Sequence, residues 1–290
     1  MSWGKHTGFV YWAVMGFLGL LHVGILFMNV AYTTPTQGYD WPGHLTYLHH
    51  VARHWRAPSA AVTPQFFNPP LYYFCVAALH SLVGGSLGQV GQIFNLLLAG
   101  STLILLMLIA YKTWRGYLLP SLTLVGLYIC NPTVYRAFGM VRPEAMLIPL
   151  FAGAGVLVLW SAEGSQARWP VIAVWSGMVS GIAVGVRQWG VFLEIALLLW
   201  MAVTYAKASQ ASFLEGLGYL GLQMAVFLGL AALFFSMRGG DVLTFNAPSQ
   251  VPDLAFVTHL ELASLFTHPV RPAMNYRFWP VLYADFWGDY

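Results

Sequence analysis

Long apolar segments separated by short polar links run through most of the chain. The apolar segments cover residues 8–32, 89–111, 117–131, 145–160, 170–186, 189–205 and 219–237. Segments of about 15–25 apolar residues have the length that a helix needs to cross a bilayer. No alternating strand pattern interrupts them, and backbone groups in lipid must be hydrogen-bonded within their own segment. The pattern therefore predicts an all-α polytopic membrane protein with about seven transmembrane helices within residues 1–237.

One further apolar segment, residues 70–84, has an ambiguous position. It would form about 22 Å of helix, which is short for a hydrocarbon core of about 30 Å. If it lies against the outer interface, all three lysines fall on the cytoplasmic side, as the positive-inside rule requires. If it crosses, Lys112 and Arg115 face outward. We favour seven spans, which place the loop 33–69 and the polar tail 238–290 on the same outer face.

Composition narrows the class of protein. Of the 290 residues, 58% are hydrophobic and 8% are charged, which excludes an ordinary soluble domain. The net charge of +3 is small and dispersed, so no nucleic-acid partner is predicted. The sequence contains no Walker glycine loop and no HExxH pattern. We therefore predict no cofactor and no soluble nucleotide-binding domain.

The polar stretch 38–73 carries the densest cluster of reactive side chains. Asp40 precedes Trp41-Pro42, a pattern that starts a helix, here over about residues 41–55. A carboxylate beside a membrane is costly unless it is solvated or used, so Asp40 is a helix cap, a catalytic group or both. His44 lies one turn later on the same face. The four histidines of this stretch are not spaced as three converging metal ligands, and we predict no metal site.

Arginine and glutamate occur at other predicted outer boundaries. Arg142 and Glu144 flank Pro143 before one span, and Arg187 ends another. One interpretation is structural, namely a mutual ion pair or arginines that extend to the interface. The other is phosphate binding, for which the planar guanidinium is suited.

Two features inside the spans are predicted to be structural. Glu194 lies within the segment 189–205 and should face the bundle interior as a hydrogen-bonding partner. Gly177, Gly181 and Gly185 form a face of small residues that allows close helix packing.

Several short motifs together carry a family resemblance. After the first span come Tyr39-Asp40 with His44, then Asn68-Pro69-Pro70-Leu71-Tyr72-Tyr73, Arg142-Pro143-Glu144, Arg187-Gln188 and the tail motif at residues 283–290. In this order the chain resembles the GT-C glycosyltransferases, in particular dolichyl-phosphate-mannose-protein mannosyltransferases and bacterial aminoarabinose transferases. Many members have an acidic residue directly after the catalytic carboxylate, where this chain has Trp41.

The resemblance implies a function and a site. It implies a seven-span module with interfacial helices in the first outer loop, usually followed by further spans, so residues 238–290 would precede more chain. It implies transfer of a hexosyl or pentosyl group, with inversion, from a polyprenyl-phosphate donor to a glycan, lipid or protein hydroxyl, on the outer face of the cell membrane if the protein is bacterial. Asp40 would be the general base, and the substrate-binding residues would be His44, Tyr72, Arg142, Glu144 and Arg187.

Two other classes remain open on the sequence. A multi-pass transporter would use Arg187, Glu194 and the histidines as an ion path. However, the internal repeats and paired broken helices that are frequent in transporters are not evident. A non-catalytic assembly subunit that kept the fold is the other alternative.

Overall fold

The computed structural model describes residues 4–32, 35–36, 41–59, 61–163, 168–207, 212–238, 269–271 and 276–277. The α-helices are α1 (Gly4–Tyr32), α2 (Trp41–His54), α3 (Leu71–Val83), α4 (Leu87–Trp114), α5 (Leu118–Ile129), α6 (Pro132–Gly139), α7 (Glu144–Glu163), α8 (Trp169–Val186), α9 (Val191–Lys207) and α10 (Phe213–Ser236). Two 3₁₀ turns, η1 (Pro64–Phe67) and η3 (Gln188–Gly190), and an antiparallel pair of short strands, β1 (Pro269–Arg271) and β2 (Tyr276–Arg277), complete the described elements.

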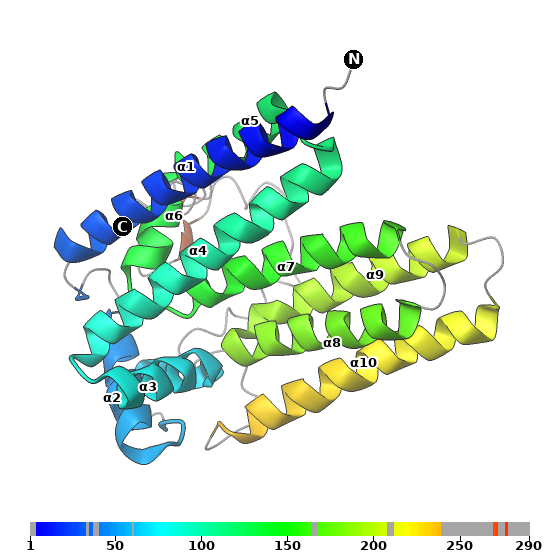
Figure 1. Ribbon diagram of the computed structural model, residues 1–290. Coiled ribbons are helices and arrows are strands. Elements are labelled where there is room, and N and C mark those ends of the chain that lie inside the picture. Colours follow the sequence, from blue (N-terminus) through cyan, green and yellow to red (C-terminus); the bar gives the residue numbers. More distant parts are fainter. Residues whose placement is uncertain are drawn as a thin grey trace.

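The predicted fold class is confirmed. By length and hydropathy, six helices of the described chain can cross a membrane: α1, α4, α7, α8, α9 with its preceding 3₁₀ turn, and α10. They form a helical bundle (Figure 1), and many of their large apolar side chains are exposed. Exposed apolar surface of this extent is what a lipid-facing helix requires. The chain is therefore a multi-pass integral membrane protein.

The span predicted at residues 117–131 is shorter than expected. Helix α5 has only 12 residues, about 18 Å of helix, and α6 follows after a break. Helix α5 packs in an apolar cluster around Met107, in the last third of α4. Helix α6 packs beside Leu26, near the end of α1, and Gln92 in the second turn of α4 donates to the Gly139 carbonyl oxygen (2.9 Å). The chain thus returns along α4 in two short helices, and the span predicted at residues 117–131 is not among the six described helices that are long enough to cross a membrane.

Helices α2 and α3 lie together at one end of the bundle (Figure 1). Helix α2 covers the residues predicted for it. Helix α3 corresponds to the ambiguous segment and has only 13 residues. Trp114 at the end of α4 lies at the far end of the bundle from Glu144 at the start of α7. The end that carries α2 and α3 is therefore opposite the one that carries Lys112.

The predicted glycine face on α8 is confirmed as a packing surface. A Cβ atom added at Gly177 would lie 2.4 Å from the Gln223 carbonyl oxygen of α10, and one at Gly185 would lie 2.3 Å from the Phe234 ring. Gly181 faces Leu230 in the same way. Only glycine permits so close an approach, and α8 and α10 pack along most of their length as a result.

The arrangement of the two ends predicts how the chain is oriented in a membrane. We expect Ser59→Cys, next to α2, to react with a membrane-impermeant maleimide on sealed cells. Thr113→Cys, at the other end of α4, should react only after lysis. Both native positions are exposed, and Cys75 and Cys130 would first be replaced by serine to remove background labelling. Labelling of both cysteines from the same side would contradict the proposed order of passes.

Candidate functional site

Helix α2 presents a buried stripe to α3. His44, Tyr47, Leu48 and Val51 are buried and follow the spacing of one helix face. Tyr47 and Val51 pack with Tyr73 in the largest apolar cluster of the described chain. The Tyr47 and Tyr73 rings stack with centroids 3.8 Å apart and an interplanar angle of 10°. This packing holds the hydroxyl groups of both tyrosines within hydrogen-bond distance of Asn68.

Asn68 is held between α2 and α3 by local chain geometry. Thr63 caps η1 by accepting from the backbone N–H of Gln65 (3.3 Å). The Asn68 N–H then donates to the Gln65 carbonyl oxygen (2.9 Å). Because Pro69 follows, the backbone of Asn68 is extended, at φ −68° and ψ 135°. The Asn68 carbonyl oxygen accepts from the Tyr47 hydroxyl (3.0 Å), which leaves the amide side chain for other contacts.

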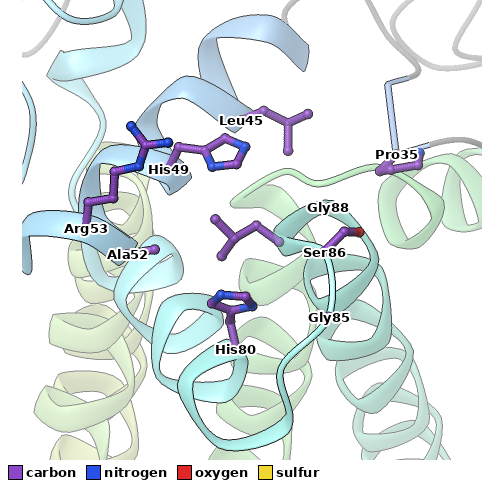
Figure 2. A pocket seen from close by; sticks show the side chains of 10 residues that line it. Pro35, Leu45, His49, Ala52, Arg53, His80, Gly85, Ser86 and Gly88 are labelled. Carbon is purple, nitrogen blue, oxygen red and sulfur yellow. The ribbon is translucent and has the colours of Figure 1, made fainter.

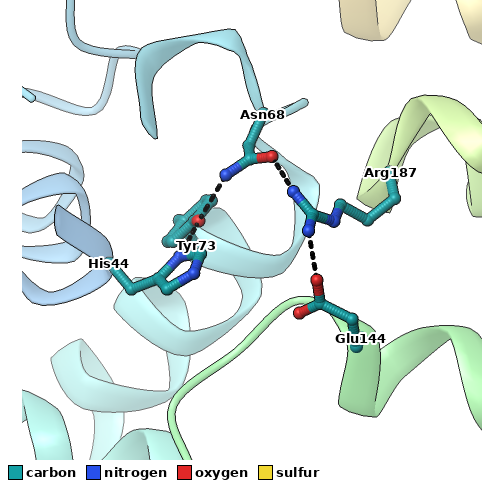
Figure 3. A network of polar contacts seen from close by, with 5 residues as sticks. All are labelled: His44, Asn68, Tyr73, Glu144 and Arg187. Carbon is teal, nitrogen blue, oxygen red and sulfur yellow. Dashed lines mark hydrogen bonds and ion pairs between the residues drawn. The ribbon is translucent and has the colours of Figure 1, made fainter. Parts of the chain in front are cut away.

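Arg187, which follows α8, contacts the Asn68 side chain. It follows the last residue of α8 in extended conformation, at φ −150° and ψ 139°. One terminal nitrogen of its guanidinium donates to the Asn68 Oδ1 atom. The other donates to the Glu144 Oε1 atom at the start of α7, which makes an ion pair. The segment between α2 and α3, the start of α7 and the end of α8 therefore contribute residues to one network (Figure 3).

The network continues to His44 through Tyr73. The Asn68 amide nitrogen donates to the Tyr73 hydroxyl oxygen (3.4 Å), and that hydroxyl lies 2.6 Å from His44 Nδ1. Burial raises the pKa of Tyr73, and the nearby Tyr47 adds to this, while Arg187 opposes it. The phenol therefore keeps its hydrogen at neutral pH, and the direction of its hydrogen bond with His44 follows the tautomer of the imidazole.

Only part of this network is open to the outside. His44, Asn68 and Tyr73 are buried, whereas the side chains of Arg187 and Glu144 are 17% and 39% exposed. A guanidinium has five N–H donors, and the two contacts with Asn68 and Glu144 leave three. The Arg187 Nε atom and the Glu144 Oε2 atom are buried and have no hydrogen-bond partner among the described residues. Such atoms in a native structure call for an explanation. Here the ion pair keeps one donor, Arg187 Nε, and one acceptor, Glu144 Oε2, without a partner among the described residues.

The predicted site residues take different positions in the structure. His44, Glu144 and Arg187 are brought together. Tyr72 is fully buried and turns away, because its hydroxyl donates to Asn95 Oδ1 of α4 (3.0 Å). Arg142 is half-buried just before α7, where its carbonyl oxygen accepts from Ala145 N–H (3.3 Å).

Asp40 lies outside the described residues. The structure confirms that a helix starts at the next residue, Trp41. The role of Asp40 as cap or base stays a prediction, and so do the substrate-binding roles of the other predicted site residues.

Sequence reasoning did not assign Asn68, Tyr73 or Tyr47 to the site. The signal for Asn68 and Tyr73 was present in the motif at residues 68–73, because a rigid Asn-Pro-Pro triplet fixes the residues at either side of it. Tyr47 shares the buried face of α2 with His44, and its contact with Tyr73 follows from the pairing of α2 with α3. The sequence gives no information on that pairing.

The structural role predicted for Glu194 agrees with its contacts. Its side chain is 1% exposed in the bundle interior. Its Oε2 atom lies 2.5 Å from the Ser180 hydroxyl of α8 and accepts from the Gln223 amide of α10 (3.2 Å). Glu194 thus joins α9 to both neighbouring helices, at a distance from Arg187.

Comparison with known proteins leaves the assignment to the residues themselves. Searches of protein-family models, of curated proteins and of solved structures find no significant match to this chain.

Proposed function

We propose that the protein is a membrane glycosyltransferase that moves a sugar from a polyprenyl-phosphate donor to an acceptor hydroxyl at the end of the bundle that carries α2 and α3. The observation that carries this proposal is Arg187. Its side chain is partly exposed beside the membrane-spanning helices, and apart from the buried Nε it keeps one N–H donor on each terminal nitrogen after its contacts with Asn68 and Glu144. A planar cation of this kind suits the oxygens of a phosphate group.

The position of Arg187 suits a donor that arrives through the bilayer. A lipid-linked phosphate sits at the interface, and Arg187 directly follows a helix long enough to reach it. Asn68 and Glu144 hold the guanidinium in one orientation. Such preorganised donors stabilise negative charge more effectively than donors that must first be ordered. We assign the donor phosphate to Arg187, with Arg142 at the same end of the bundle as a second cationic candidate.

The reaction that we propose is a single displacement with inversion. The acceptor oxygen attacks the anomeric carbon as the bond from that carbon to the phosphate oxygen breaks. The bonding electrons leave with the phosphate, which Arg187 stabilises. The acceptor hydroxyl proton passes to a carboxylate, for which Asp40 is the candidate. The phosphate leaves as an anion, and the leaving group requires no strong general acid.

The proposal assigns distinct roles to the two carboxylates near α2. Glu144 is paired with Arg187, and an ion pair favours the charged form of a carboxylate and makes it a weaker base. We therefore keep Asp40 as the base and assign Glu144 to positioning of Arg187. The acceptor is a glycan, lipid or protein hydroxyl on the outer face of the membrane.

Incubation with labelled donors tests the proposal. Purified protein in lipid nanodiscs would be mixed with polyprenyl-phosphate sugars carrying a radioactive hexose or pentose. We expect time-dependent loss of labelled donor and its conversion to product or, with water as acceptor, to free sugar. Donor binding without any turnover would favour an assembly subunit, and neither binding nor turnover would reject the proposal. Uptake of an ion or solute by the same protein in sealed liposomes would identify a transporter.

A further inference from the structure

A second polar site lies on the opposite face of α2 from His44. Leu45, His49, Ala52 and Arg53 follow one another at helical spacing and line a pocket of about 480 Å³. His80, near the end of α3, and Ser86, which precedes α4, line the same pocket (Figure 2). A volume of this size is within the range of small-molecule sites.

The shape of the pocket depends on the turn between α3 and α4. Gly84 and Gly85 have φ angles of +70° and +87°, in the region that favours glycine. Two such residues in succession reverse the chain sharply, so the end of α3 and the start of α4 lie on the same side of the pocket. His80 and Ser86 are thereby brought opposite the polar face of α2 (Figure 2).

The ionisable side chains among the described residues that line the pocket are all basic. Arg53 is a permanent cation, and His49 and His80 are N–H donors that can also become cations. None of the described residues that line the pocket carries a carboxylate. The His80 Nδ1 atom is buried and has no hydrogen-bond partner within the part of the chain that the structure describes. Three basic side chains along one pocket, with no carboxylate among its described lining residues, indicate an anionic ligand.

Much of the remaining lining is apolar, and the end of α3, which carries His80, exposes large apolar side chains. Leu45, Ala52 and Leu87 lie beside the basic side chains. Leu82 and Val83, at the end of α3, are large apolar residues that are 83% and 61% exposed. A purely hydrophilic anion would make no use of these surfaces, whereas a phosphate joined to an apolar chain would contact both parts.

We infer that the pocket between α2, α3 and the start of α4 binds a phosphate group that belongs to an amphiphile, with Arg53, His49 and His80 as its ligands. The site is separate from the Arg187 network, since the two occupy opposite faces of α2. The inference does not depend on the proposed glycosyl transfer.

Binding of short-chain lipids tests this inference. Purified full-length protein in neutral detergent would be titrated with dihexanoyl phosphatidic acid, dihexanoyl phosphatidylcholine and inorganic phosphate. Each titration would be made on the wild type and on Arg187→Ala, so that the Arg187 site does not contribute. We expect saturable binding of phosphatidic acid in both proteins and weaker binding of the zwitterionic lipid. Saturation by inorganic phosphate as well would identify the phosphate group alone as the ligand.

Matched variants locate the site. Arg53→Ala and His80→Gln should each weaken phosphatidic acid binding by about tenfold or more, the usual effect of a lost charge-assisted contact. Arg56→Ala removes the same charge just after α2 but does not line the pocket, and it should bind as the wild type does. Carbethoxylation provides a second measurement on the wild type, in which bound lipid should protect His49 and His80 but not the exposed His54. Equal weakening in Arg53→Ala and Arg56→Ala, or no protection of His49 and His80, would overturn the inference.

Discussion

Replacement of Asp40 by asparagine is expected to lower sugar transfer by about 10²–10⁴-fold, the usual size of a general-base contribution. Asparagine keeps the size of aspartate and its capacity to cap the helix that starts at Trp41, but it cannot accept the proton of an acceptor hydroxyl. The fold and the affinity for donor should therefore be unchanged. Turnover and donor binding would be measured on the same purified preparation.

Two further variants separate the two roles of Asp40. Asp40→Glu keeps the carboxylate and should retain more activity than Asp40→Asn, whereas Asp40→Ala should lose both the base and the cap. Glu144→Gln serves as the carboxylate control, and its main effect should be on donor affinity. If Asp40→Asn turns over near the wild-type rate while Glu144→Gln does not, the base is Glu144.

Replacement of Arg187 by alanine is expected to weaken donor binding by about tenfold to hundredfold. A hydrogen bond to a charged group contributes roughly 1.5–3 kcal/mol, and each 1.4 kcal/mol corresponds to about a factor of ten in affinity. The variant also leaves Glu144 and the Asn68 side chain without their shared partner. Donor affinity can be measured by titration with an unreactive polyprenyl phosphate.

The lysine variant distinguishes phosphate binding from simple charge. Arg187→Lys keeps one positive charge but cannot contact Asn68 and Glu144 and also present further donors in one plane. We expect it to recover only part of the lost affinity. Arg56→Ala, which removes an exposed arginine outside the network, is the control. Unchanged donor affinity in Arg187→Ala would make the ion pair with Glu144 purely structural.

The sequence predicted the helical architecture because membrane insertion imposes a strong constraint on it. Apolar length alone located the long helices, and the glycine spacing on α8 located the close contact with α10. The short α5 was less predictable. Residues 117–131 are apolar throughout most of their length, but Pro132 starts a new helix after a break. Apolarity does not determine where a helix bends when two packed pieces satisfy the same surroundings.

Part of the site was predictable because ionisable side chains near a membrane span carry a high free-energy cost unless they have partners. His44, Glu144 and Arg187 were identified because polar groups near apolar spans require partners. Their partners could not be identified in the same way. The sequence suggested a mutual ion pair among Arg142, Glu144 and Arg187 without indicating the partner of Glu144. In the structure Glu144 pairs with Arg187, 43 positions along the chain. Both Tyr72 and its neighbour Tyr73 are buried, but Tyr72 contacts α4 and Tyr73 contacts α2. These contacts depend on where the two helices lie, which a pattern along one segment does not encode.

The glycine face of α8 also has a mechanical consequence. Gly177 lets α8 approach the Gln223 carbonyl oxygen of α10, and Gly181 and Gly185 leave room for the Leu230 and Phe234 side chains. A sliding motion between the two helices would move these groups out of the spaces that the glycines leave, so we expect α8 and α10 to move together. An opening of the Arg187 network would then separate Arg187 from Asn68, from Glu144 of α7 or from both. The bond between Arg187 and the Asn68 side chain joins the segment between α2 and α3 to this pair of helices, and it must break if that segment moves away from them.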